Sequence, residues 1–299
     1  MNMKKIIISL ILCSAALYAQ AASVNVRASY AYSSDYNQAR AGLALPLGLN
    51  ASVGLEGRYV EDKFSVEEGA FADPIYSVYL PIRLDLDLVK LHLTPFYYFE
   101  NKSDDPFYQD ATAYGINGQL IMNLVEDEVN QFFTTAYIGV SFANQKGTLF
   151  EEGNQPANED YSQMAYTLGF IQNFFGTFAF QAAATAYQYP NGIDGVEYFR
   201  GIMDQNDLAF TQSYDVNRAL GKYVLSARIS RMWPDTRSSL YAGYHFAEFY
   251  TARPQHSILV GNTFFVTANA YLDMAYNHLQ DVEGNNKRDI FFVNLNIAF

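Results

Sequence analysis

The sequence predicts an all-β protein: a single transmembrane, antiparallel, up-and-down β-barrel of about 14 strands, with about 12 to 16 strands left open. Three observations predict this fold. Apolar side chains recur at every second position over most of the chain, and mean hydropathy is −0.09 although half of the residues are apolar. Beyond the first residues, no apolar run approaches the roughly 18 residues that a membrane helix needs. A barrel strand alternates lipid-facing and lumen-facing side chains, so its mean hydropathy stays near zero.

The first residues have the pattern of a secretory signal peptide. Lys4 and Lys5 precede an apolar run over residues 6–17, and small residues stand two apart at Ala19 and Ala21. A positive segment, a short apolar segment and an A-x-A site describe such a peptide, and the apolar run is too short to span a membrane. We therefore predict a signal peptide over residues 1–22 and a β-barrel over residues 23–299.

Composition excludes several classes of function. Removal of the signal peptide also removes Cys13, the only cysteine, so the mature chain has no disulfide, thiol nucleophile or Cys-ligated zinc. Preceded by Leu12, Cys13 also lacks the small neighbour that a lipoprotein signal requires. The chain has 31 acidic residues against 19 lysines and arginines. An acidic chain does not suit nucleic acid, whose phosphates need a basic surface. No cofactor is expected.

Strict alternation identifies the strands. In residues 49–59, for example, Val53 and Leu55 alternate with Ser52, Glu56 and Arg58. Such alternation is typical of a two-faced strand and not of a helix. The runs of this kind are 24–32, 37–45, 49–59, 76–84, 89–101, 111–124, 131–144, 161–173, 177–189, 207–216, 222–232, 238–249, 255–262, 265–279 and 291–299. Most are about as long as a tilted strand needs to be to cross a bilayer.

The connections between these runs are of two kinds. Tight turns are expected at residues 46–48, 85–89, 174–176, 234–236 and 262–263, and long polar loops at 61–73, 100–110, 144–160, 190–207 and 280–289. Short turns at one end and long loops at the other are typical of outer-membrane barrels. The 15 runs conflict with the even number that places both termini at one end. We expect the error between residues 190 and 262, where 196–203 is another candidate strand, and predict 14.

The C-terminus resembles the assembly signature of Gram-negative outer-membrane β-barrel proteins. It has a terminal aromatic residue and apolar residues at every second position before it. The residues concerned are Phe291, Val293, Leu295, Ile297 and Phe299. The resemblance implies a porin-like superfamily, but no specific family, and a cell outer membrane as the destination. It also implies outer-membrane lipid, lipopolysaccharide and the barrel-assembly machinery as partners, because an apolar strand edge can be read by strand addition.

The ionisable residues of the strands share the parity of the polar face, which predicts that they line a pore. These residues are Arg27, Arg40, Glu56, Arg58, Arg83, Asp85, Lys90, His92, Arg228, His245 and Asp273. A cation on the lipid face would cost roughly 2–4 kcal/mol at the midplane. The arginines among the first four strands, Arg27, Arg40, Arg58 and Arg83, form a hypothetical basic ladder. We therefore predict a porin-type channel for passive diffusion of small hydrophilic solutes or ions.

The sequence leaves alternative functions open. The inner charges could instead pair with one another and close the barrel, which would then act in adhesion or envelope anchoring through its acidic loops. Export of a polymer or a lipidic product is a third function. No catalytic residue and no metal-binding spacing is predicted, although His278 is expected to face the lipid rim. Homo-oligomerisation is left open.

Overall fold

The structure of the chain is a computed structural model. It describes residues 24–66, 69–101, 108–149, 157–192, 201–202, 216–217, 220–250, 252–284 and 287–299. The predicted signal peptide and most of the candidate strands 196–203 and 207–216 lie outside these residues. In the ranges just given, no helix has the length and apolar character that crossing a membrane requires.

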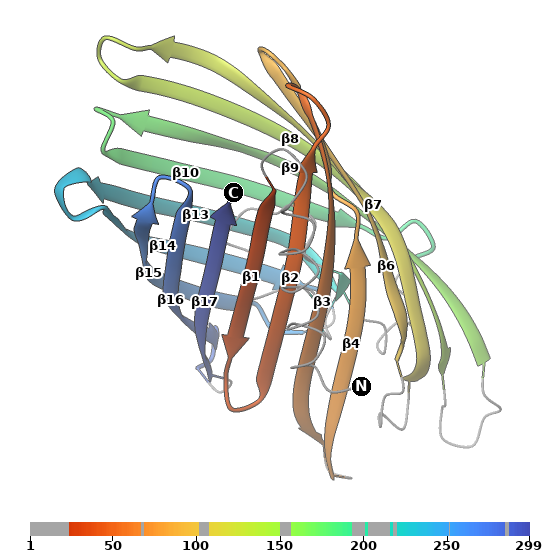
Figure 1. Ribbon diagram of the computed structural model, residues 1–299. Coiled ribbons are helices and arrows are strands. Elements are labelled where there is room, and N and C mark those ends of the chain that lie inside the picture. Colours follow the sequence, from red (N-terminus) through yellow and green to blue (C-terminus); the bar gives the residue numbers. More distant parts are fainter. Residues whose placement is uncertain are drawn as a thin grey trace.

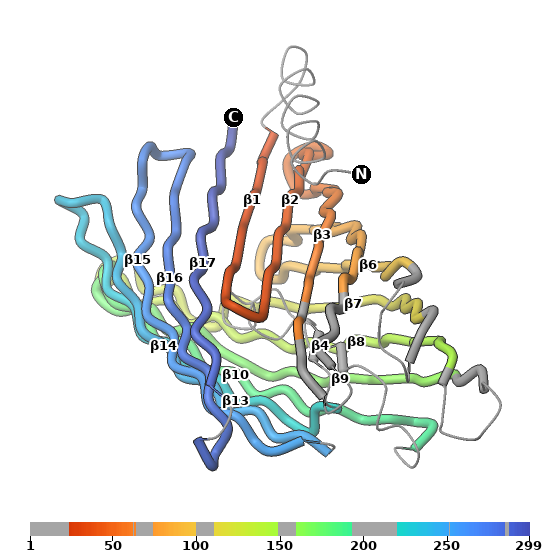
Figure 2. Tube along the Cα trace, turned by 90° about the horizontal axis from the view of Figure 1, so that it is seen from below, coloured from red at the N-terminus to blue at the C-terminus, as the bar shows by residue number. Residues whose placement is uncertain are grey.

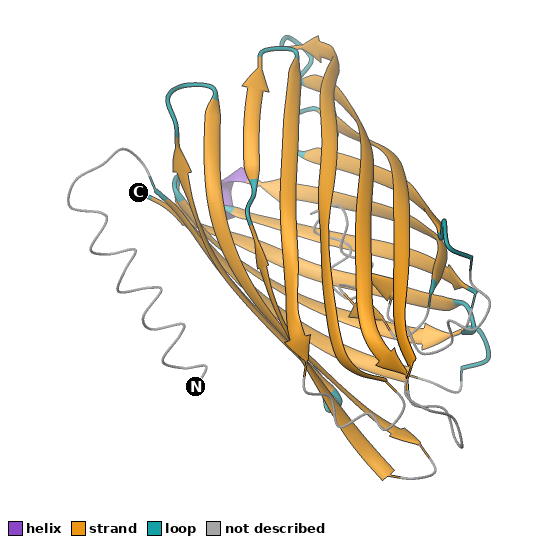
Figure 3. Cartoon of the chain, turned by 90° about the vertical axis from the view of Figure 1, so that its right-hand side faces the viewer, coloured by secondary structure: helices purple, strands orange, loops and turns teal. Residues whose placement is uncertain are grey.

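One antiparallel sheet closes on itself (Figures 1 and 3). Its strands are β1 (Asn25–Tyr32), β2 (Tyr36–Pro46), β3 (Ala51–Val66), β4 (Gly69–Tyr79), β5 (Ile82–Leu86), β6 (Val89–Asn101), β7 (Tyr108–Asp127), β8 (Phe132–Leu149), β9 (Ala157–Phe174), β10 (Phe178–Gln188), β13 (Gly221–Trp233), β14 (Ser238–Phe249), β15 (Gln255–Thr267), β16 (Ala270–Asp281) and β17 (Lys287–Ala298). A separate pair, β11 (Gly201–Ile202) and β12 (Val216–Asn217), forms a two-stranded sheet.

We call each continuous piece of the barrel wall, from one end to the other, a stave. The barrel has 14 staves, because β4 and β5 are two parts of one stave. Both pair with β3 on one side and with β6 on the other. The predicted run 76–84 is thus interrupted at Leu80 and Pro81, because a proline has no N–H to donate to the ladder. Its carbonyl still accepts a bond from the Gly54 amide at 2.7 Å. The prediction of 14 strands is confirmed.

Pairing of the first strand with the last closes the ring. The register runs from Asn25 opposite Ala298 to Tyr32 opposite Phe291. At one end the Phe299 amide donates to the Val24 carbonyl at 2.9 Å, and at the other the Arg288 guanidinium contacts Asp35 at 3.0 Å. Figure 2 shows β1 and β17 side by side. We call the end where β1 begins and β17 finishes the terminus end, and the opposite end the loop end.

Two predicted connections are wrong. The turn expected at residues 262–263 does not exist, because β15 continues to Thr267 and the chain turns at residues 268–269. Thr263 is polar because its side chain points inward, where its hydroxyl donates to Asp273 at 3.0 Å. The loop expected at 61–73 is instead a strand hairpin, paired from Glu61 opposite Pro74 onward. A charged strand is stable where the sheet meets water, so acidic composition alone does not identify a loop.

The other expected long loops are shorter than predicted. Strand β6 continues to Asn101, β8 to Leu149 and β16 to Asp281, while β7, β9 and β17 begin at Tyr108, Ala157 and Lys287. The expected loop at 190–207 lies mostly outside the described residues. Tight turns follow β2, β5, β7, β9, β13 and β15, and because neighbouring strands are antiparallel all six lie at the terminus end.

Candidate functional site: the inner wall of the barrel

The two faces of the sheet differ in chemistry. Side chains such as Leu55, Ile116 and Val260 are large, apolar and 43–45% exposed, and they lie on the outer face. The inner face carries the intervening positions, which are polar and small side chains together with a buried apolar cluster that includes Tyr79, Phe96, Tyr98, Tyr241 and Leu259. A membrane admits only helices and closed barrels, because every backbone polar group in lipid needs an internal partner. The ring is closed and its outer face is apolar.

The protein is a membrane-spanning β-barrel. All eleven predicted lumenal residues stand on its inner face, since the strand registers place them opposite one another or opposite inward neighbours. Examples are Arg40 opposite Arg58, Arg83 opposite His92, and His245 opposite Ser257. The structure divides these residues into three groups with different surroundings.

The first group is a buried cluster near β3, which we call the Arg58 cluster. The Arg58 guanidinium forms an ion pair with Glu56 and lies 3.7 Å from the centre of the Tyr79 ring. The Tyr79 hydroxyl lies 2.5 Å from that of Tyr98. Arg40 stands beside Arg58 in register, and Arg40, Glu56 and Arg58 are each only 7% exposed. Two rungs of the predicted basic ladder are therefore packed into the wall.

The second group lies on β13 to β16. The Arg228 guanidinium sits 3.6 Å from the centre of the Tyr241 ring. The Tyr241 hydroxyl donates to both oxygens of Asp273, at 2.9 and 3.1 Å, and Thr263 donates to the same carboxylate at 3.0 Å. His245 is buried on the same wall. Strand β3 is the third stave and β13 the tenth, and Tyr79 and Tyr241 belong to one buried apolar cluster, so packed side chains connect the two groups inside the ring.

The third group lies nearer the terminus end and is open. The Lys90 ammonium stands 3.4 Å from Asp85, with both side chains nearly half exposed. Arg83 is exposed, and Arg27 and His92 are partly so. A recess that opens to solvent lies between β1, β2, β3 and β5, and Arg27 and Arg83 are among its lining residues.

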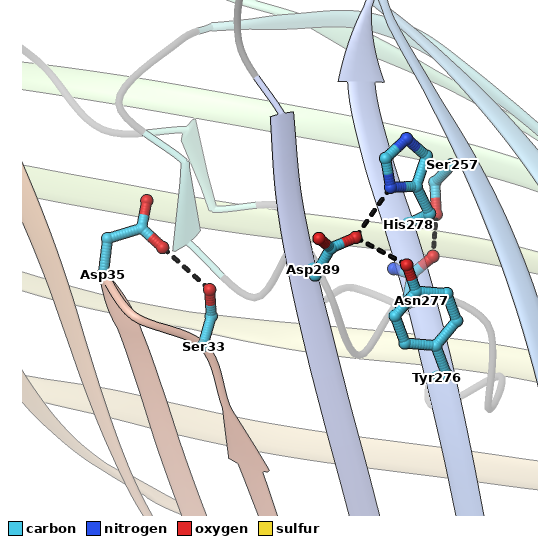
Figure 4. A network of polar contacts seen from close by, with 7 residues as sticks. All are labelled: Ser33, Asp35, Ser257, Tyr276, Asn277, His278 and Asp289. Carbon is cyan, nitrogen blue, oxygen red and sulfur yellow. Dashed lines mark hydrogen bonds and ion pairs between the residues drawn. The ribbon is translucent and has the colours of Figure 1, made fainter.

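The outer face carries a small polar network near the loop end (Figure 4). The His278 Nδ1 lies 2.7 Å from Asp289 Oδ1, and the Tyr276 hydroxyl donates to that oxygen at 2.6 Å. Ser257 donates to Asn277, and both of these are buried on the inner face. The histidine–carboxylate pair is thus separated by the sheet from this serine. Among the described residues, no group of three potential metal ligands gathers.

The predicted assembly residues form an outward row on β17. Phe291, Val293 and Leu295 are 57%, 45% and 39% exposed, and Phe299 is also exposed. Ile297 is partly exposed. Both edges of β17 are paired in the closed ring. Recognition of this row during assembly stays a prediction.

Several contacts of the charged residues were not predicted from the sequence. Strand alternation alone places Glu56 and Arg58 on one face and two residues apart, so their ion pair could have been predicted from the sequence. The contact of Arg228 with Tyr241 and the bonds of Tyr241 and Thr263 to Asp273 were not, because they depend on cross-strand register. No local signal in the sequence gives that register.

Comparisons with known proteins find similar folds at low identity. CdiB from Acinetobacter baumannii is 11% identical with a TM-score of 0.49, covering 93% of this chain and 60% of CdiB. The toluene transporter TodX of Pseudomonas putida is 8% identical with a TM-score of 0.47, covering 92% and 88%. The KdgM porin is 6% identical with a TM-score of 0.44, covering 92% and 99%. The chain thus spans less than two thirds of CdiB.

Comparison by sequence finds nothing: no known protein family and no curated protein matches the chain.

Proposed function

We propose that the barrel is an outer-membrane channel through which small hydrophilic solutes or ions diffuse passively. The observation that supports this is a charged inner wall in a closed ring of 14 staves. Barrels of about 8 strands are filled by their own side chains, whereas those of about 16 to 18 leave an aqueous passage. The exposed Arg83 and the nearly half-exposed Asp85 and Lys90 line the part of the lumen that opens at the terminus end.

The remaining roles follow from this proposal. A cleaved signal peptide would deliver the chain, and the barrel-assembly machinery would read the outward row of β17. The terminus end would face the periplasm, and lipid and lipopolysaccharide would cover the apolar outer face.

A second candidate is a closed barrel that acts in adhesion or envelope anchoring. The burial of Arg40, Glu56, Arg58 and His245 on the inner wall favours it, because an aqueous passage at that level would expose them. The acidic side chains that would carry this function, such as Glu67, Asp104 and Glu151, lie outside the described residues.

Conductance separates the two functions. We expect the purified, refolded barrel to give steady, ohmic steps in planar bilayers, because water and ions enter along the exposed charges. Refolded protein without current at any applied voltage, with insertion verified by protease protection, would support the closed barrel and contradict the channel.

Ion preference is a sharper readout of the same passage. Arg83→Glu should shift the reversal potential measured in a salt gradient in the direction of greater cation selectivity, since it inverts an exposed charge on the inner wall. Arg231→Glu is the matched control. Arg231 is on the outer face near the same end, opposite the exposed Leu240, so the same charge change there should leave the reversal potential unaltered. Equal shifts in both variants would contradict a path along Arg83.

A further inference from the structure

The exposure of the inward side chains falls along the strands from the terminus end to the loop end. On β3, Ser52 near the terminus end is partly exposed, whereas Arg58 and Val60 farther along the strand are buried. On β14, Ser239 near the terminus end is partly exposed and His245 is buried. All five side chains share the inward parity of their strands, so the alternation of the two faces does not explain the difference.

The same fall occurs elsewhere in the ring. Thr135 on β8 and Asp273 on β16 are partly exposed, whereas Ser141 and Asn277, nearer the loop end of the same strands, are buried. Strands β3, β8, β14 and β16 are the third, seventh, eleventh and thirteenth staves. The loss of contact with water is therefore a property of one level of the barrel and not of a single patch of its wall.

Burial continues to the rim at the loop end. Tyr36 is the first residue of β2, Phe249 the last of β14 and Asp281 the last of β16, and all three lie at this end. Their exposed fractions are only 2%, 6% and 2%. An inward side chain at the mouth of an open lumen would be in contact with water. The loop-end half of the inner wall is therefore packed.

The packed half contains an apolar layer. The buried apolar cluster of the inner wall, which includes Phe96 and Leu259, lies there. Its member Tyr79 contacts the Arg58 guanidinium at 3.7 Å from the ring centre, and Arg58 forms an ion pair with Glu56. Hydrophobic constrictions block ions in channels, because they exclude the water that hydrates them. This half of the lumen therefore resists the passage of hydrophilic solutes.

The terminus-end half is open and charged. Arg83 is exposed, and the Asp85 and Lys90 side chains are nearly half exposed. Ser52 lines the recess that opens to solvent. A dissolved solute can contact these groups without displacing a buried side chain. They form the wall of a vestibule that opens at the terminus end.

We propose that the lumen is a one-sided vestibule: solutes reach its inner wall from the terminus end, and the packed loop-end half is the barrier that decides which of them cross. The proposal deepens the proposed function and rests on it only in calling the packed half a barrier to transport. Inorganic ions that cross this half follow a path too narrow for a bulky organic reagent, so sidedness is measurable in a conducting barrel.

Cysteine labelling tests the side from which the inner wall is reached. Ser52→Cys, Ser141→Cys and Ser257→Cys are made singly in a Cys13→Ser background, because Cys13 is the only native cysteine. Each barrel is refolded into vesicles, and protease digestion determines its orientation. A membrane-impermeant maleimide coupled to a sulfonated dye is added outside, or is trapped inside while a thiol scavenger is present outside.

We expect labelling from one side only. Ser52→Cys should react at least about 10-fold faster from the terminus-end side than from the loop-end side, because reaction requires an accessible thiol. Ser141→Cys and Ser257→Cys should react from neither side, since these inward serines are 4% and 0% exposed. Lys222→Cys is the control for the opposite side. Lys222 is exposed at the loop end of β13, so its cysteine should react from that side.

The outcomes are distinguishable. Labelling of every variant in urea verifies the reagent, and the heat-dependent gel mobility of the barrel verifies folding. Equal rates for Ser52→Cys from both sides, or a rate for Ser141→Cys equal to that of Ser52→Cys, would overturn the one-sided vestibule and leave an open channel intact. One-sided labelling of a barrel that carries no current would contradict the channel and keep the vestibule.

Discussion

Gly115→Ala should destabilise the barrel by about 3 kcal/mol, the upper range for overpacking a well-packed interior. Gly115 lies on β7 with its missing side chain toward the lumen. A Cβ there would stand 2.1 Å from the backbone oxygen of Phe142 and 2.4 Å from Cζ of Phe96. The Phe96 ring cannot simply rotate away, because it packs edge-on against Tyr98 with ring centres 5.5 Å apart. The backbone oxygen cannot move without breaking the ladder between β7 and β8.

The measurement is reversible urea unfolding in lipid vesicles, followed by the fluorescence of Trp233, the only tryptophan of the chain. Gly57→Ala is the control. Gly57 lies on β3, and a Cβ there would meet nothing within 4 Å. The control should unfold at the same urea concentration as the parent. Similar losses of stability in both variants would show that glycine flexibility, and not space, decides the effect.

The sequence was sufficient for the fold class because the wall obeys one local rule. Lipid outside and polar side chains inside impose a period of two on every stave, and this period is visible without knowledge of strand pairing. The staves and the inward set of charges were therefore predictable. The break at Pro81 was predictable in principle from the missing N–H, but apolar alternation continues through it and conceals it.

The failures have a common physical cause. Asn262 and Thr263 resemble a turn because they are polar, yet Thr263 is an inward residue of β15 that binds Asp273. The acids of 61–73 resemble a loop, yet Glu61 lies in a paired hairpin, with Lys63 at 3.2 Å. In this fold a polar side chain indicates contact with water outside the membrane or with the lumen, and a residue within a strand can make either contact.

The division of the inner arginines was beyond the sequence. Parity gives Arg58 and Arg83 the same orientation, but only the register and the shape of the wall show that one is packed against a tyrosine and the other lines open space. Function in a barrel depends on this difference, because a solute can use only a charge that it can reach.

Glu56→Met should therefore lower the free energy of unfolding more than the loss of any exposed charge on the inner wall does. Removing one partner of a buried ion pair leaves the other charge without compensation, which typically costs about 3–5 kcal/mol. Arg58 is 7% exposed, and its contact with the Tyr79 ring at 3.7 Å replaces only part of the lost attraction. The unfolding free energy from the same urea titration should fall accordingly.

Two further variants test whether burial is the cause. Asp85→Asn also removes the acid of an inner-wall ion pair, but the Asp85 and Lys90 side chains are nearly half exposed, so the loss should be below about 1 kcal/mol. Combining Glu56→Met with Arg58→Met removes both buried charges, and most of the lost stability should return, because a buried pair replaced by apolar residues of similar size is often neutral. If the double variant were as unstable as Glu56→Met alone, the cost would lie in the packing of residue 56 and not in the stranded guanidinium.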